Sequence, residues 1–233
     1  MIRKLLSLGL MLCLFPVKSH GVIAYVQSTG GNTTATSVDV SFVDTVTSGN
    51  LIVVAARIGT DQTCTVSDSA GNTYTQQIDQ KFTPVTDDHL YIFYAANVTG
   101  GSLTITIDPS GTPSIRWTIH EYSGIATSSP VDQSTSLRDD LGLGTAVDSG
   151  NITTTQADEL LFGAASVSGS KDFTPGADYT ERQEIVQKIS TEDRIVSSTL
   201  TDSADWTISA NDTYGAAIVS FKGATSRRVM VVD

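Results

Sequence analysis

One apolar phrase occurs twice in the sequence, and this repetition restricts the fold more than any other feature. Residues 48–59 read SGNLIVVAARIG and residues 157–169 read ADELLFGAASVSG, so that Leu51 recurs 109 positions later as Leu160. Each phrase is a short apolar run behind polar turn residues, which is typical of a strand in the middle of a packed sheet. The sequence therefore predicts two β-units whose repeated phrases occupy equivalent central positions.

The rest of the chain favours an all-β fold. Gly, Thr and Ser are dense, β-branched residues fill the apolar runs, and no segment longer than a turn has a helical pattern. We predict a jelly-roll-like β-sandwich built from two internal repeats, about 37–124 and 146–223. A chain of this size folds commonly as one β-domain, here 22–223, with a C-terminal tail at 224–233.

The first 21 residues have the features of a secretory signal peptide. Arg3 and Lys4 give a basic start, and the apolar run at 5–17 is too short to span a bilayer. Small residues precede a predicted cut before Val22. We expect a secreted protein, extracellular or on a cell surface, with no membrane insertion after cleavage.

The net charge restricts the kinds of partner that we expect, and the cysteine content restricts the disulfides. The predicted cleavage removes three cations, takes the net charge from −11 to −14 and leaves 212 residues. Such an acidic surface argues against nucleic acid as a partner. Only Cys64 remains, so no intrachain disulfide is expected, and its alternation with polar neighbours places it beside Val66 on one strand face. We favour a buried structural thiol over a reactive one.

Signals for catalysis are weak. The mature chain has two histidines, His89 and His120, and contains no Gly-x-Ser-x-Gly elbow, which argues against a serine hydrolase. No His/Cys cluster predicts a zinc site. Glycoside hydrolysis needs two carboxylates, and three adjacent acid pairs are available, which we interpret as solvated turns. They are Asp87-Asp88, Asp139-Asp140 and Glu192-Asp193.

Asp68 and Asn72 bound a cluster of turn residues, DSAGN, between two strand-like segments. Their oxygen atoms are a weak candidate for a structural calcium site. The spacing and the late Glu of an EF-hand are missing, so we favour a hairpin connection and predict no cofactor.

Aromatic residues supply the candidate binding surface. The segment 90–95 is apolar on both faces, with Tyr91 and Phe93 on one of them. We favour a loop that covers this face, and the alternative is an exposed stacking platform for sugar rings. His120 and Tyr122 share one face of a later strand and are the other binding candidates.

Glu121 lies on the opposite, apolar face of that strand, with Trp117 and Ile119. An ionised carboxylate turned inward needs a partner. The candidates are Arg182 and Arg194, and we favour Arg182, whose guanidinium would form two hydrogen bonds and tie the first repeat to the second. The alternative is that Glu121 is a general acid in a groove.

Several phrases resemble those of secreted bacterial β-sandwich modules of uncharacterised function found in extracellular and cell-surface proteins. They are AGNTYTQ, YAANVTGGSLTITI, HEYSGIATSSPVDQS, TTTQADELLFGA and FTPGADYTERQE, and the resemblance covers residues 48–222. It implies a jelly-roll-like sandwich outside the cell that serves adhesion, glycan binding or assembly. It supplies no catalytic residues.

Two classes of function remain from the sequence. We favour a non-catalytic extracellular module that binds glycans or cell-surface polymers, or that assembles with copies of itself. The alternative is a polysaccharide-active enzyme with a carboxylate pair in an aromatic groove. Converging acids about 5 to 10 Å apart beside exposed aromatic side chains would favour the enzyme.

Overall fold

The computed structural model describes residues 18–20, 22–82 and 87–227, which contain twenty strands and no helix. The all-β prediction is therefore confirmed. The strands are β1 (Lys18–His20), β2 (Ala24–Thr34), β3 (Val38–Val40), β4 (Leu51–Ile58), β5 (Cys64–Asp68), β6 (Thr75–Phe82), β7 (Asp88–Ala95), β8 (Ile105–Pro109), β9 (Ser114–Ser123), β10 (Val131–Asp139), β11 (Ala146–Asp148), β12 (Ile152–Thr153), β13 (Glu159–Val167), β14 (Phe173–Pro175), β15 (Thr180–Ile185), β16 (Ile189–Val196), β17 (Thr201–Asp202), β18 (Asp205–Ile208), β19 (Tyr214–Lys222) and β20 (Thr225–Arg227).

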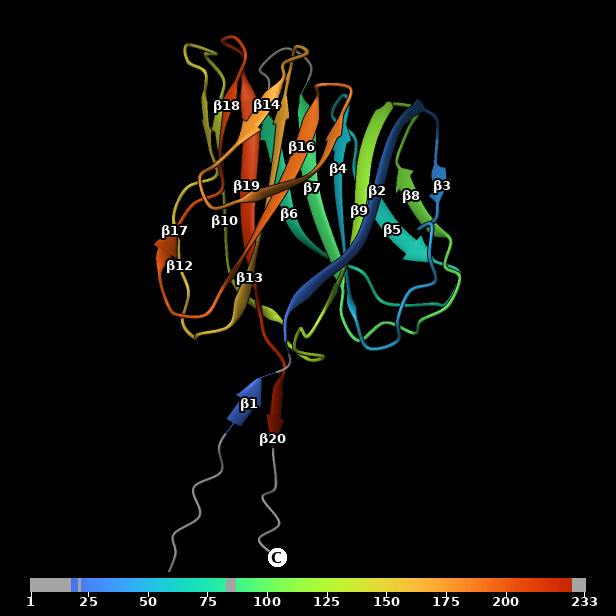
Figure 1. Cartoon of the computed structure of the whole chain (residues 1–233). Coiled ribbons are helices and arrows are strands. Elements are labelled where there is room, and N and C mark those ends of the chain that lie inside the picture. Colours follow the sequence, from blue (N-terminus) through green and yellow to red (C-terminus); the bar gives the residue numbers. More distant parts are fainter. Residues whose placement is uncertain (1–17, 21, 83–86, 228–233) are drawn as a thin grey trace, which may run out of the picture.

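Four of the six antiparallel sheets in the described residues form stacked layers in the body of the molecule, and the short β12-β17 sheet accompanies the second half (Figure 1). The first half contributes a three-stranded sheet, β3-β8-β5, and a five-stranded sheet, β2-β9-β4-β7-β6. The second half contributes a five-stranded sheet, β10-β19-β13-β16-β15, and a three-stranded sheet, β11-β18-β14. The five-stranded sheets face each other in the middle, and the three-stranded sheets cover the outside.

The repeated apolar phrases form β4 and β13, the central strands of the two five-stranded sheets. Every residue of both strands is buried. This explains why neither phrase alternates, since each central strand has a hydrophobic core on both faces. One core, which includes Leu51 and Leu160, lies between the five-stranded sheets, and each half has a further core under its three-stranded sheet. The described residues thus form three hydrophobic cores, whereas a simple two-sheet sandwich needs only one.

The two halves have the same strand order. In each five-stranded sheet the first strand of the half lies at the edge, the last strand lies beside it, and the repeated phrase is in the centre. The edge strands β6 and β15 carry a β-bulge at the same register, at Gln77 and at Arg182. Internal duplication would produce this correspondence, and it stays a prediction here.

The halves pack on each other with approximate two-fold symmetry. Strand β2 contacts β15, and the equivalent strand of the second half, β10, contacts the equivalent strand of the first half, β6. The same exchange relates the contact of β9 with β15 to that of β19 with β6. This reciprocity is the mark of an isologous interface, as in a symmetric dimer. The interface therefore has two sides that occupy equivalent positions.

The two halves of the structure begin earlier than the predicted repeats. Strands β2 and β10 are the first strands of the two halves, whereas the predicted repeats start at about 37 and 146. The predicted signal peptide lies mostly outside the described residues, in 1–17 and 21, as does the end of the tail at 228–233. The described remainder of each segment forms β1 and β20, which pair with each other below the body (Figure 1).

Candidate functional site

One side of the interface between the halves is polar. It lies where β15 and β16 face β2 and β9. Tyr122 contacts Asp193 and His120 contacts Thr191 across the two halves, and Arg182 binds Asp193 within the second half. We name this group the polar seam, and it consists of His120, Tyr122, Arg182, Thr191 and Asp193.

Arg182 enters the polar seam because β15 bulges at this residue. The residues before and after it pair with Glu192 and Thr191, so Arg182 has no partner of its own on β16. A bulge leaves its extra residue out of the ladder and redirects the side chain. The guanidinium carbon of Arg182 lies 4.0 Å from the ring centre of Tyr25 on β2. The bulge thus lets a residue of the second half pack on an aromatic ring of the first.

Asp193 is the centre of the polar seam, and its side chain is 2% exposed. It accepts hydrogen bonds from Nε and Nη2 of Arg182, at 2.8 and 2.9 Å. The hydroxyl of Tyr122 donates a third bond at 2.7 Å. Burial and the neighbouring Asp193 raise the pKa of Tyr122, which keeps its hydroxyl protonated as a donor. The buried carboxylate is therefore well satisfied, and it links β9 to β15 and β16.

His120 extends the polar seam inward and is fully buried. Its Nε2 lies 3.3 Å from the hydroxyl oxygen of Thr191, and Nδ1 has no hydrogen-bond partner among the described residues. Burial, helped by the charge of Arg182, lowers the pKa of His120 to about 3. The imidazole is therefore neutral at physiological pH and adds no charge to this side of the interface.

The equivalent side of the interface is apolar at its centre. The shared register places Phe221 where the polar seam has Tyr122, and Tyr94 where it has Asp193. The rings of Tyr94 and Phe221 meet edge to face, with centroids 5.6 Å apart. By the same register the remaining members of the polar seam, His120, Thr191 and Arg182, correspond to Val219, Ile92 and Gln77.

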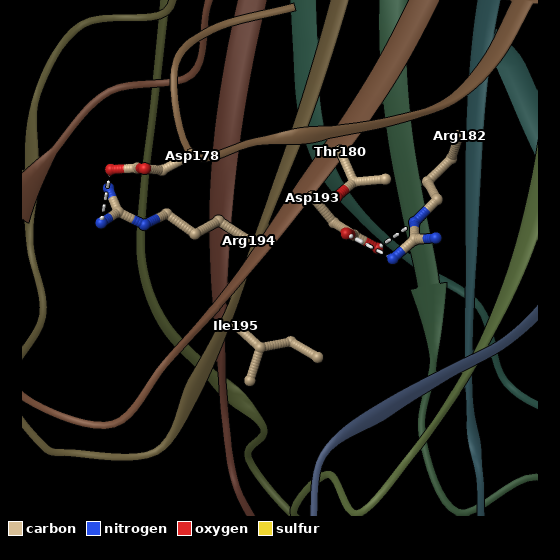
Figure 2. A pocket seen from close by; sticks show the side chains of 6 residues that line it. All are labelled: Asp178, Thr180, Arg182, Asp193, Arg194 and Ile195. Carbon is tan, nitrogen blue, oxygen red and sulfur yellow. Dashed lines mark hydrogen bonds and ion pairs between the residues drawn. The ribbon is translucent and has the colours of Figure 1, made fainter.

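The polar seam reaches the surface at an open hollow of about 350 Å³. Strand β15 begins opposite Asp193, so the residues of β16 that follow Asp193 pair only with β13. The hollow lies at this point, where β15 no longer covers the edge of β16. We name this the edge hollow, and Figure 2 shows the six residues that line it: Asp178, Thr180, Arg182, Asp193, Arg194 and Ile195.

The edge hollow combines exposed polar groups with an apolar patch. Arg194 forms two ion pairs, from Nη1 to Oδ2 of Asp202 at 2.8 Å and from Nη2 to Oδ2 of Asp178 at 3.2 Å. The side chain of Asp178 is 71% exposed, Thr180 is exposed, and Ile195 is 45% exposed. Donors, acceptors and methyl groups are therefore all accessible within one small depression.

The predicted pair of Glu121 with Arg182 is wrong, because Arg182 binds Asp193. Glu121 is fully buried and has different partners. Its Oε1 accepts from the backbone N–H of Thr47 at 2.8 Å and from the amide of Asn50 at 2.6 Å, and its Oε2 accepts from the amide of Gln27 at 2.6 Å. The carboxylate thus holds the segment before β4 from within the first half, and it faces no groove. The other candidate, Arg194, binds Asp178 and Asp202 instead.

The predicted aromatic binding residues do not form a surface platform. Tyr91 and Phe93 are 1% and 3% exposed and lie in the core under the three-stranded sheet of the first half. His120 and Tyr122 are fully buried in the polar seam. A surface ligand therefore has no direct access to any of the four. The sequence did, however, select three members of the polar seam, His120, Tyr122 and Arg182, and one residue that lines the edge hollow, Arg194.

Asp68 organises the turn that follows β5. Its Oδ1 accepts from the backbone N–H groups of Ala70 and Asn72, both at 3.0 Å, and its Oδ2 accepts from the Asn72 amide and the Tyr74 hydroxyl. Calcium ligation by this carboxylate would have to displace those donors, so the residues fit a turn better than an ion site. Among the described residues, no group of three or more His, Cys, Asp or Glu side chains is arranged to hold a metal ion.

Cys64 lies in the core of the first half, 4% exposed, with Val66 packed against that core. Burial raises the pKa of Cys64 to about 12, which keeps the thiol protonated and unreactive.

The adjacent acids Glu192 and Asp193 are not a solvated turn, because they lie in the middle of β16 and are buried. Alternation of β16 sends Asp193 to the polar seam and Glu192 to the core of the second half.

Glu192 and Glu159 are two buried carboxyl groups outside the polar seam whose pKa is raised. Glu192 accepts a hydrogen bond from the backbone N–H of Gly176 at 3.1 Å. Burial raises the pKa of Glu192 to about 8. Glu159, at the start of β13, has its pKa raised to about 7, mainly by burial and further by Asp132. Both are fully buried, so neither faces a surface ligand.

Sequence reasoning missed Tyr25 and gave Asp193 no role beyond a turn. The usable signal was the run STEDR at 190–194, which occupies the position of the apolar run YIFYA at 91–95 in the other half.

Comparisons with family models, with curated proteins and with solved structures give no match. In the described part of the chain, no helix is long and apolar enough to cross a membrane.

Proposed function

We propose that the chain is a non-catalytic extracellular module that binds carbohydrate, and that the edge hollow receives the sugar. The observation that supports this most is the contrast between the two sides of the interface. The apolar side packs around Tyr94 and Phe221, whereas the equivalent polar side holds a charged pair and opens into the edge hollow. A polar arrangement that the fold can do without is a candidate for a binding role.

The chemistry of the edge hollow suits a sugar. Hydroxyl groups of a pyranose both donate and accept hydrogen bonds, and Asp178 and Thr180 present exposed oxygen atoms. The methyl groups of Ile195 suit the apolar face of the ring. The acids Asp178 and Asp193 are each paired with an arginine, so the hollow as a whole carries little net positive charge. This favours a neutral saccharide over an anionic one.

The same contacts weigh against the enzyme alternative. Glycoside hydrolysis requires a carboxylic acid and a carboxylate that both face the bond to be cleaved. In the edge hollow both acids, Asp178 and Asp193, are already paired with arginines, so the two carboxylates do not face a common open site. The two carboxyl groups whose pKa is raised to about 7 and about 8, Glu159 and Glu192, are fully buried. A binding role therefore agrees better with the arrangement of acids.

A glycan array with the purified protein tests the proposal, with neutral and uronate-containing polysaccharides printed side by side. We expect neutral glycans to bind and Asp178→Ala and Arg194→Met to lower the signal at least tenfold. The matched control is Arg138→Met, which removes a surface arginine paired with Asp140 at 3.0 Å outside the hollow. Release of reducing ends from a bound polysaccharide would support the enzyme alternative, and an array without signal would contradict the proposal.

A further inference from the structure

Four strands form the outer edges of the two five-stranded sheets, and they differ in charge. Three of them, β6, β10 and β15, each contain at least two charged residues. The fourth, β2, has eleven residues and none of them is charged. Its sequence, AYVQSTGGNTT, is followed by a further uncharged stretch up to Val38. Exposed edge strands in soluble proteins are usually protected by charges, by proline or by bulges.

The open edge of β2 is long and regular. Its one register irregularity lies near the start, between Tyr25 and Gln27, and the pairing with β9 is then continuous to Thr34. No strand within the described residues pairs with the other edge of β2. Figure 1 shows β2 as the long blue ribbon at the outside of its sheet. The unpaired peptide groups of this edge are a template for a further strand.

The strand is also held in place before any partner arrives. The amide of Gln27 donates to Glu121 at 2.6 Å, and its oxygen accepts from the backbone N–H of Asp44 at 3.2 Å. In the middle of the strand, the two glycines lie against Trp117 and Ile185, where an added Cβ would approach a ring or methyl carbon to within 2.8 Å. A rigid edge loses little conformational freedom when it gains a partner.

We propose that β2 pairs with the β2 strand of a second copy of this chain, antiparallel and across a two-fold axis. Each chain carries a net charge of −11, so two copies repel each other over most of their surface. The β2 strand itself carries no carboxylate, so two copies that meet along it place no carboxylates of the paired strands side by side. The two five-stranded sheets then form one continuous sheet of ten strands, in which threonines such as Thr29 and Thr33 pair across the new junction. This proposal does not rest on sugar binding at the edge hollow.

Sedimentation velocity over a wide range of protein and salt concentrations tests the proposal. We expect a reversible monomer–dimer equilibrium that strengthens with added salt, because salt screens the repulsion between the acidic chains while the β2 contact itself is uncharged. The double variant Asn32→Lys/Thr34→Lys places two exposed charges on the edge and should weaken dimerisation about tenfold or more. The matched control, Thr75→Lys/Gln76→Lys, changes two exposed residues of β6 and should leave it unchanged.

Hydrogen exchange locates the contact and keeps the test decisive if a variant folds poorly. In the unmodified protein, amides of residues 28–34 should gain protection as the dimer forms, while those of β6 do not. A monomer at every concentration and salt level overturns the proposal. A dimer without added protection in β2, or one that salt dissociates, overturns it as well.

Discussion

At one side of the interface Tyr122 meets Asp193, and at the equivalent place on the other side Phe221 meets Tyr94. The first pair joins β9, the last strand of the first half, to β16, which lies beside β13. The second pair joins β19, the last strand of the second half, to β7, which lies beside β4. The first pair is a hydrogen bond of 2.7 Å to a buried carboxylate, and the second is a contact between two rings. One backbone arrangement therefore accepts two different chemistries.

The difference shows what the interface needs and what it does not. At the centre of the apolar side, Tyr94 and Phe221 pack the halves together through a ring contact, and hydrogen bonds between β6 and β10 lie at its edge. A buried charge pair must overcome the desolvation of both ions, and its replacement by apolar residues of similar volume is often neutral or stabilising. The polar seam is thus a weak contributor to net stability, although loss of one member alone leaves the others without partners. We infer that the polar seam serves the edge hollow beside it.

The largest loss should follow from removal of the central carboxylate. Asp193→Ala leaves the guanidinium of Arg182 and the hydroxyl of Tyr122 without their acceptor. We expect the free energy of unfolding to fall by about 3 kcal/mol, at the lower end of the range for a broken buried pair, because Arg182 is partly exposed. The control Tyr94→Phe removes a polar atom from the apolar side and should cost less than about 1 kcal/mol. Urea unfolding of both variants gives the comparison.

A double-mutant cycle tests which residues belong to the polar seam. Arg182→Met and Tyr122→Phe share Asp193 as a partner, so their losses, about 1 to 3 kcal/mol each, should not add. Arg182→Met and Glu121→Gln share no partner and should add within about 0.5 kcal/mol. Thermal or urea unfolding measures each corner of both cycles. Strong coupling between Arg182 and Glu121 would contradict the contacts described above.

The pH dependence of stability tests the interior of β16, where Glu192 occupies the position of Phe93 in the other half. A carboxyl whose pKa is raised by folding binds its proton more tightly in the folded state. Its stabilising effect is therefore complete below the ordinary value of 4.5 and is lost as the pH rises toward about 8. We expect unfolding free energy to decline over this window, and Glu192→Gln to flatten the decline. A profile that rises between pH 5 and 8 in both proteins, roughly the range where buried carboxyls titrate, would argue against a protonated Glu192.

The smallest effect should come from Thr191→Val, which is nearly isosteric. The contact that it removes, between the threonine hydroxyl and Nε2 of His120, is long at 3.3 Å. A hydrogen bond at that distance contributes little, so we expect a change within about 1 kcal/mol of zero. A loss as large as that of Asp193→Ala, measured in the same urea series, would show that His120 is a main member of the polar seam.

The sequence predicted the fold well where one local pattern determines the structure. The apolar runs of β4 and β13 can only be strands with a core on each face, and the turn at Asp68 follows from its own residues. The start of each half was missed because β2 and β10 are polar edge strands without an apolar pattern. Strand propensity alone does not distinguish such edges from loops.

The candidate site was only partly predictable for a different reason. Inward placement of Glu121 follows from alternation along one strand, but its partner depends on how distant segments meet. The amides of Gln27 and Asn50 are in reach only after the sheet has formed. In the same way, Arg182 faces Asp193 because of a bulge, which shifts the residue out of the alternation that sequence reasoning assumes.

Copying the apolar side onto the polar side tests the central claim most directly. The variant exchanges each member of the polar seam for its equivalent: His120→Val, Tyr122→Phe, Arg182→Gln, Thr191→Ile and Asp193→Tyr. We expect a folded protein whose unfolding free energy equals or exceeds that of the unmodified chain, since a buried ion pair is replaced by packed apolar groups. Binding to the neutral glycan found on the array should be lost. A variant that unfolds, or one that is stable and still binds the glycan, would contradict the claim that the polar seam is present for binding.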